Sequence, residues 1–373
     1  MRKNEAKWIE SRKRWQINVQ VEGERRTFTD TTPGTKGKIL CEHKADRWVK
    51  DGVIDKDTRI DKLFDRWIED LKLSTSRDHW KQYEGYGKNH ILPYIGAKKI
   101  SRLTQNDFQR IIDTAYKNPK GTQSIDKLSK KTLTNIRACL MSFIKYCRGE
   151  KATAWHPETL TIPAGSRKLK KTILTAEDIN TLFTVSTTML RGNEVEDRLV
   201  HAFRFQVLTG IRPGELIGLQ EGDIKGSRLT IDRSINIHGE TTDGKNENAV
   251  RTYTLDDHAL KVLDDQKQML KQLGWISPYI FPGHDRNHLK EQTLYKSWKR
   301  YCRSNGITNA MTPYEMRHTF VSVNTNMPDS LKKLVVGHSE NMDTQGIYGH
   351  EKADDMDTAA VYISDAFKAI LGW

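Results

Sequence analysis

The sequence predicts a multidomain, mainly α-helical chain. A small N-terminal domain of β-sheet plus one helix comes first, then a helical bundle, then a mixed α+β domain. Three patterns predict this order: apolar and polar residues alternate over 15–29, helical periodicity dominates 60–149, and both patterns occur after residue 174. The 373 residues suffice for two to three domains at roughly 100–200 residues each. The predicted divisions are 1–57, 58–155, a basic linker over 156–173, and 174–373.

The N-terminal domain is predicted from two short alternating segments. Residues 15–21 and 25–29 have the pattern of half-buried strands, with a hairpin loop over 22–24. Residues 36–51 then predict one helix. A basic sheet of this kind fits a nucleic-acid groove, and a small adaptor domain is an equally open interpretation.

Apolar stripes at helical spacing predict a bundle of four or five helices over 60–149. One stripe lies within 63–71 and the longest within 133–147. We interpret both as core. Residues 150–173 lose the periodicity and contain proline, glycine and a basic cluster, which predicts a linker.

The C-terminal domain begins near Leu174, where Thr175 and Asp178 form a capping-box pattern. Helical pattern continues over 194–209. Residues 228–237 and 249–255 predict strands joined by a polar loop, and 256–272, 288–304 and 357–371 predict helices.

Charge points to a polyanionic partner. The net charge is +13, and residues 61–172 hold 23 Lys and Arg against 11 Asp and Glu. Nucleic acid is the leading candidate, and a solvated basic surface is the alternative. The residues expected to contact DNA phosphates lie in the linker, on the bundle and in the strand over 249–255: Arg167, Lys168, Lys170, Lys171, Lys130, Lys131 and Arg251.

Several classes are excluded by what the sequence does not contain. Four well-separated cysteines make no CxxC, no apolar run reaches 18 residues, and the N-terminus has no signal-peptide pattern. We therefore expect a cytoplasmic protein with no membrane partner. No GxxxxGK[ST] loop and no carboxylate cluster suited to two magnesium ions occurs.

Four segments of the C-terminal domain carry candidate chemistry. Arg212 lies in the turn of TGIRPGEL (209–216), with Glu215 three residues later. Lys245 lies in the polar loop between the two predicted strands. Tyr314 and Arg317 share a helix face in TPYEMRHTF (312–320). His338 lies in VGHS, and Tyr348 follows ten residues later.

This ordered set resembles the tyrosine recombinases, or phage-type integrases. Their pattern is Arg, Lys, His-x-x-Arg, His or Trp, and Tyr, in that order in a C-terminal domain. Here the matching residues are Arg212, Lys245, Arg317, His338 and Tyr348. The resemblance extends over the chain. It implies an arm-type DNA-binding domain, a SAM-like core-binding bundle and a catalytic domain.

The resemblance implies DNA cleavage without metal, ATP or any other cofactor, and the absence of the corresponding motifs agrees with this expectation. Arg212 and Arg317 would bind the non-bridging phosphate oxygens, and Tyr348 would form a covalent 3′-phosphotyrosine. Lys245 would be the general acid for the 5′ oxygen, His338 would hydrogen-bond the phosphate, and Glu215 would orient the arginines.

One position departs from the family pattern, because Tyr314 replaces the first histidine of His-x-x-Arg. A phenol, whose pKa in water is about 10, is a poor proton acceptor near neutral pH. Tyr314 can still donate a hydrogen bond to phosphate. The acceptor of the Tyr348 proton is left open between His338 and a phosphate oxygen.

The resemblance also implies an integrase of a phage or mobile element, acting on double-stranded DNA at core and arm sites in the bacterial nucleoid. It implies a homotetramer on synapsis, with an excisionase and a host DNA-bending protein as candidate partners. The C-terminal helix would pack on a neighbouring protomer, or alternatively on its own domain. A type IB topoisomerase and a DNA-binding protein without catalysis are the rival functions.

Overall fold

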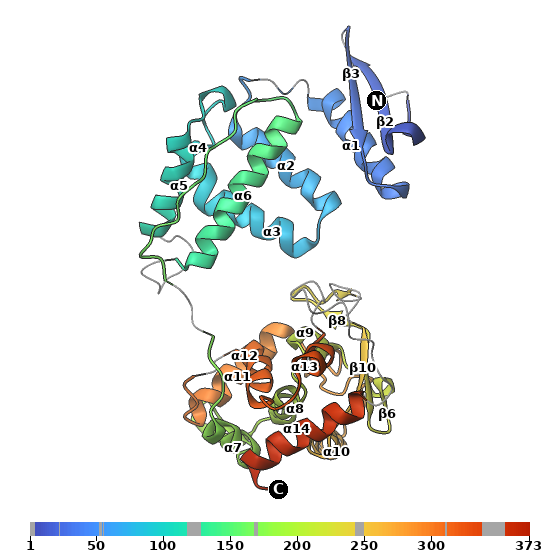
Figure 1. Cartoon of the computed structure of the whole chain (residues 1–373), viewed down its shortest axis with the longest axis vertical. Helices are drawn as coiled ribbons and strands as arrows, with labels where there is room; N and C mark the ends of the chain where they lie inside the picture. Colours follow the sequence, from blue (N-terminus) through green and yellow to red (C-terminus); the bar gives the residue numbers. More distant parts are fainter. Residues whose placement is uncertain are drawn as a thin grey trace. The chain divides into compact units, whose positions relative to one another are not determined.

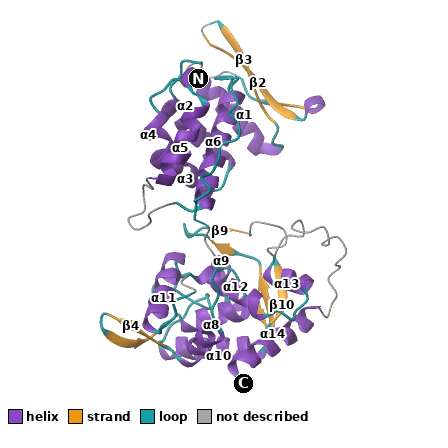
Figure 2. Cartoon of the chain, turned by 60° about the vertical axis from the view of Figure 1, so that its left-hand side comes forward, coloured by secondary structure: helices purple, strands orange, loops and turns teal. Residues whose placement is uncertain are grey.

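The computed structural model describes residues 4–21, 23–51, 54, 56–117, 128–167, 171–242, 250–309, 312–337 and 355–373. The chain divides into two compact units, Met1–Leu169 and Lys170–Trp373 (Figure 1). This division falls inside the predicted linker. As predicted, helices predominate and the sheets are small and antiparallel (Figure 2).

The first unit begins with a three-stranded sheet covered by one helix. The antiparallel strands are β1 (Lys7–Ile9), β2 (Arg14–Val21) and β3 (Glu24–Asp30), in that spatial order. Helix α1 (Gly34–Asp51) packs on β2 and β3. The core contains Ile17, Val19 and Phe28 from the sheet, and Trp48 from the helix. The alternation correctly predicts the hairpin and misses β1, which is too short to show a period.

The rest of the first unit is a helical bundle. Its helices are α2 (Ile60–Ser74), α3 (Arg77–Tyr86), α4 (Leu92–Ile95), α5 (Gln105–Lys117) and α6 (Lys130–Gly149), with a π-helical turn over Gly87–Ile91. The predicted stripes form its core, as Trp67 and Phe143 illustrate. Leu160 is also buried there, so the beginning of the predicted linker packs on the bundle.

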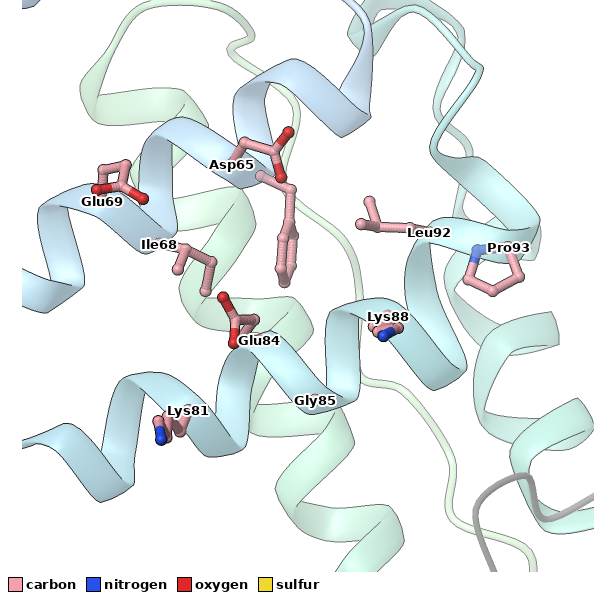
Figure 3. A pocket seen from close by; sticks show the side chains of 10 residues that line it. Asp65, Ile68, Glu69, Lys81, Glu84, Gly85, Lys88, Leu92 and Pro93 are labelled. Atoms are coloured by element: carbon pink, nitrogen blue, oxygen red, sulfur yellow. The ribbon is translucent and has the colours of Figure 1, made fainter. Parts of the chain in front are cut away.

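An ion pair joins the two parts of this unit. Arg47 of α1 forms a charge-assisted pair with Asp70 of α2 and also donates to the Arg66 carbonyl oxygen at 2.7 Å. A hollow of about 820 Å³ lies among α2, α3 and α4 (Figure 3). Its wall combines acidic and basic side chains: Asp65, Glu69, Glu84, Lys81 and Lys88.

The second unit surrounds the buried helix α8 (Val200–Thr209). The other helices are α7 (Ala176–Thr184), α9 (Pro213–Gly218), α10 (Asp257–Gln272), α11 (Glu291–Ser304), α12 (Pro313–Val323), α13 (Asp329–Val336) and α14 (Asp355–Leu371). Strands β6 (Ile224–Lys225), β7 (Arg228–Ile231) and β10 (Arg251–Thr254) form one sheet in the order β10-β7-β6. Two hairpins are β4 (Thr187–Leu190) with β5 (Asn193–Glu196), and β8 (Ser234–Ile235) with β9 (Thr241–Thr242).

The prediction of a helix over 194–209 is wrong for the first residues of that range. Residues 193–196 are strand β5, and the helix begins only at Val200. The turn before β5 explains the difference. Arg191 and Gly192 have φ angles of 53° and 86°, which are the left-handed values that a tight hairpin requires.

The C-terminal helix α14 packs on its own domain (Figure 1). It contacts α7, α13 and β10, and Ile363 and Phe367 are buried. In this chain the helix forms the intramolecular cap, and packing on a neighbouring protomer stays a prediction.

Candidate active site

Arg212 is positioned by the turn between α8 and α9. Gly210 ends α8 with a φ of 65°, and Arg212 is the residue before the first turn of α9. Its Nη1 donates to Glu215 Oε1 at 2.7 Å, and its backbone N–H donates to Glu215 Oε2 at 2.9 Å. The side chain is 31% exposed. The bonds to Glu215 therefore hold Arg212 in place while part of its side chain is open to solvent.

Arg317 lies on α12, whose start is fixed by the Thr312–Glu315 capping box. Its Nη1 donates to the Gly210 carbonyl at 2.9 Å and its Nη2 to the Val336 carbonyl at 2.5 Å. The residue is 2% exposed. Burial, together with the nearby charge of Arg212, lowers the pKa of Arg317 to about 10, so the guanidinium still carries its charge at neutral pH.

Glu215 is the carboxylate at the centre of the arginines. It is 3% exposed and pairs with Arg251 as well as with Arg212. Burial opposes its ionisation, but the hydrogen bonds and charges of Arg251 and then Arg212 outweigh burial and hold the pKa of Glu215 below its usual value. Glu215 is therefore a carboxylate at neutral pH.

Arg251, expected to contact DNA, is placed inside the domain. Nη1 and Nη2 donate to the two oxygens of Glu215 at 3.1 and 2.9 Å, and Nε donates to the Val335 carbonyl at 2.7 Å. The ion pair with Glu215 neutralises the charge of Arg251. Among the described residues, by contrast, no carboxylate forms an ion pair with Arg317. A phosphate contact by Arg251 does not fit this geometry.

Tyr314 occupies the first turn of α12 and is 43% exposed. Its ring packs edge-on to His318, with 5.4 Å between the ring centroids. Burial, followed by the charges of Lys171 and Arg317, lowers the pKa of His318 and keeps the imidazole neutral. His318 is thus an imidazole beside the position where the family histidine is missing, and the sequence pattern does not single it out.

The sequence does not predict two other features near the site. Three arginines bond three consecutive carbonyls at the end of α13, those of Val335, Val336 and Gly337. The start of the second unit is tied to α12, because the Leu174 N–H donates to Thr319 Oγ1 at 2.9 Å. No sequence signal identifies a carbonyl acceptor, but strand alternation does place Arg251 on the buried face with Tyr253.

Part of the expected site lies outside the described residues: Lys245, His338, Tyr348, Lys168 and Lys170. Of the expected DNA contacts that are described, Arg167, Lys130 and Lys131 are exposed at the start of α6, where the Arg167 carbonyl accepts from the Lys130 N–H at 2.9 Å. Lys171 is exposed in the second unit. The described residues contain no group of three metal-ligating side chains and no helix able to span a membrane.

Comparison with known proteins identifies the family. A model of the phage integrase family matches residues 172–354, and a model of the phage integrase N-terminal SAM-like domain matches residues 60–115. The chain belongs to the phage integrase family. The first match contains Arg212, Arg317 and Tyr348 of this tyrosine recombinase.

Relatives and solved structures extend the likeness beyond the site. A XerC-like tyrosine recombinase of Caldanaerobacter subterraneus subsp. tengcongensis is 24% identical over 348 residues, which cover 84% of each chain. The Tn1549 transposon integrase, solved with transposon right end DNA, shares 18% identity at a TM-score of 0.62, over 81% of this chain and 98% of that one. The lambda integrase, solved as a tetramer bound to a Holliday junction, shares 15% identity at a TM-score of 0.56. The match covers 93% of this chain and 96% of that one.

Proposed function

We propose that this integrase is a site-specific DNA recombinase that integrates and excises a phage or other mobile element. The observation that carries the proposal is the placement of Arg212 and Arg317. Both charged guanidiniums donate to carbonyls at the end of α13, and that of Arg317 also donates to the carbonyl that ends α8. They come from the two segments that match the family pattern, TGIRPGEL and YEMRHTF.

Both arginines keep donors for a phosphate. A guanidinium has five N–H groups. Among the described residues, two nitrogens of each side chain bond to protein atoms, which leaves three N–H groups on each for phosphate oxygens. Arg212 is already exposed, whereas Arg317 is buried. DNA binding must therefore uncover Arg317.

The proposed cleavage is a transfer of the phosphoryl group from DNA to Tyr348. The Tyr348 oxygen bonds to phosphorus while the bond from phosphorus to the DNA 5′ oxygen breaks. Lys245 gives the 5′ oxygen a proton, and the Tyr348 proton passes to His338 or to a phosphate oxygen. Tyr314 donates a hydrogen bond to the phosphate. Because the phosphotyrosine retains the bond energy, the reverse attack by a 5′ hydroxyl needs neither ATP nor metal.

DNA binding is proposed for all three domains. The N-terminal sheet domain would bind arm sites, and the bundle and catalytic domain would bind the core site through Arg167, Lys130, Lys131 and Lys171, together with Lys168 and Lys170. Because each phosphate contact releases counterions, binding should weaken steeply with salt. A synaptic homotetramer, an excisionase, a host DNA-bending protein and a nucleoid location belong to the same proposal.

Covalent trapping tests the function. The protein is incubated in EDTA with DNA from the ends of its element, nicked near the crossover so that the freed strand diffuses away. We expect a protein–DNA adduct on a denaturing gel that maps to Tyr348 and is absent in Tyr348→Phe. Binding without an adduct, on verified core and arm sites, would favour the rival DNA-binding protein. Adduct and supercoil relaxation without strand exchange would favour a topoisomerase.

A further inference from the structure

A buried bidentate ion pair links β10 to α9. Arg251 faces both oxygens of Glu215, and the two side chains are 6% and 4% exposed. Burying two charges is favourable only when geometry and further hydrogen bonds are good. Here both conditions hold, because Glu215 also accepts from Arg212 and Arg251 also donates to the Val335 carbonyl.

Each member of the pair contacts a different part of the site. Glu215 holds the backbone N–H and Nη1 of Arg212, so the orientation of Arg212 depends on the carboxylate. Arg251 fixes that carboxylate at both oxygens. Without Arg251, only the two bonds from Arg212 would hold the carboxylate.

The same guanidinium also fixes the end of α13. The last carbonyls of a helix lack intrahelical partners and carry a partial negative charge. Arg251 donates to the Val335 carbonyl and Arg317 donates to the Val336 carbonyl. Arg212 donates to the carbonyl that follows, that of Gly337. The three arginines are therefore held at one helix end, and two of them, Arg251 and Arg212, also bond Glu215.

We propose that Arg251 is a positioning residue of this active site, which acts through Glu215 and the end of α13 to orient Arg212 and Arg317 toward the scissile phosphate. It does not contact DNA. This inference rests on the proposed recombinase function and adds a residue to its machinery. A misplacement of about 1 Å can cost roughly 10²-fold in rate, so loss of Arg251 should impair cleavage more than binding.

The test compares Arg251→Met and Arg251→Lys with the wild-type chain on the nicked DNA. We expect Arg251→Met to lower the single-turnover cleavage rate by roughly 10²-fold, with little change in DNA affinity or in its salt dependence. Arg251→Lys keeps the charge but cannot span both oxygens and the carbonyl, so its rate should be intermediate. If Arg251→Met fails to fold, the lysine variant still decides the question.

A pH profile separates positioning from general destabilisation. Among the described residues, the charged and titratable groups near Glu215 are Arg212, Arg251, Arg317 and the buried phenol of Tyr253. Because Arg251 lowers the pKa of Glu215, its removal should move the acidic limb of the cleavage rate to higher pH. Glu215→Gln should abolish that limb, and the effects of the two substitutions on the rate should be less than additive, because part of the Arg251 effect passes through Glu215.

Arg204→Met is the matched control. Arg204 is 7% exposed in the same domain and donates to backbone carbonyls of Leu182 and Val185, away from the arginines of the site. Its loss should lower stability without moving the acidic limb.

Three outcomes would overturn the proposal: a wild-type cleavage rate in folded Arg251→Met, additive effects with Glu215→Gln, or a weaker salt dependence that reveals a direct phosphate contact. If the wild-type chain itself forms no adduct, the proposed function fails instead.

Discussion

Gly210 connects the backbone of the fold to the site, and its replacement by alanine should be costly. Its φ is +65°, and a Cβ there would lie 2.5 Å from Cδ1 of the buried Phe320. The left-handed conformation costs an alanine about 1–2 kcal/mol, and overpacking a core adds about 1–3 kcal/mol. We therefore expect Gly210→Ala to lower the free energy of unfolding of the catalytic domain by about 2–5 kcal/mol.

Gly274 offers a matched control. Its φ is +64°, but a Cβ there would meet nothing within 4 Å. Gly274→Ala should therefore cost only the conformational part, about 1–2 kcal/mol. Urea unfolding of the full chain, followed by hydrogen exchange in peptides of α8 and α12, measures both variants. Equal losses in the two variants would refute the packing argument.

Cleavage should separate the same two variants. The Gly210 carbonyl accepts from Arg317 Nη1 at 2.9 Å, so a backbone shift at Gly210 moves Arg317. Folded Gly210→Ala should cleave more slowly than wild type, and Gly274→Ala should cleave at the wild-type rate. An unchanged rate in folded Gly210→Ala would show that this carbonyl does not position Arg317.

Three further predictions concern other parts of the chain. Arg317→Lys should lower the cleavage rate by about 10²–10³-fold in the trapping assay, because lysine cannot donate from a fork; an unchanged rate would contradict it. The hydrogen bond to the Asp256 carboxylate raises the pKa of His258; burial opposes this rise, and the hydrogen bond to the Trp373 carbonyl adds to it. The stabilisation by charged His258 is complete below the unfolded pKa of about 6.5 and is lost as pH rises through the folded pKa. Hydrogen exchange in α14 should therefore accelerate, beyond its ordinary dependence on pH, as pH rises through the folded pKa of His258. The His258→Gln variant should not show this acceleration. Asp65→Asn should raise the stability of the first unit by a few tenths of a kcal/mol in urea unfolding, since burial and acidic neighbours raise the pKa of Asp65; a loss of stability would refute this.

The sequence predicts the elements better than their contacts. Apolar periodicity correctly locates helices such as α6 and α14, because burial of one face produces the pattern. It fails at β5, where four residues are too few to show a period and the turn at Arg191 and Gly192 decides the structure. Short elements depend on turn conformation, which a hydrophobic pattern does not encode.

The candidate site shows the same limit. Family spacing singles out Arg212 and Arg317, and the structure brings both to the end of α13. Basic character alone led to a DNA-contact prediction for Arg251, although its alternation with Tyr253 placed it on the buried face. A basic residue type indicates attraction to phosphate, but whether a phosphate can contact the residue depends on the orientation of its side chain in the fold.

The charges of the site explain why the pair of Arg251 and Glu215 is useful to a recombinase. Three guanidiniums surround one carboxylate, so the cluster is left with a net charge of about +2. The end of α13 offsets part of this through its partial negative charge. A phosphodiester brings one negative charge, whereas the pentacoordinate transition state gains another when the tyrosine proton has left. Under the proposed function, the cluster would therefore match the transition state better than the bound DNA, which is the condition for accelerating cleavage. In this proposal Glu215 keeps Arg212 oriented. Arg251 neutralises the carboxylate, so that Glu215 would not cancel the charge that Arg212 and Arg317 offer to phosphate.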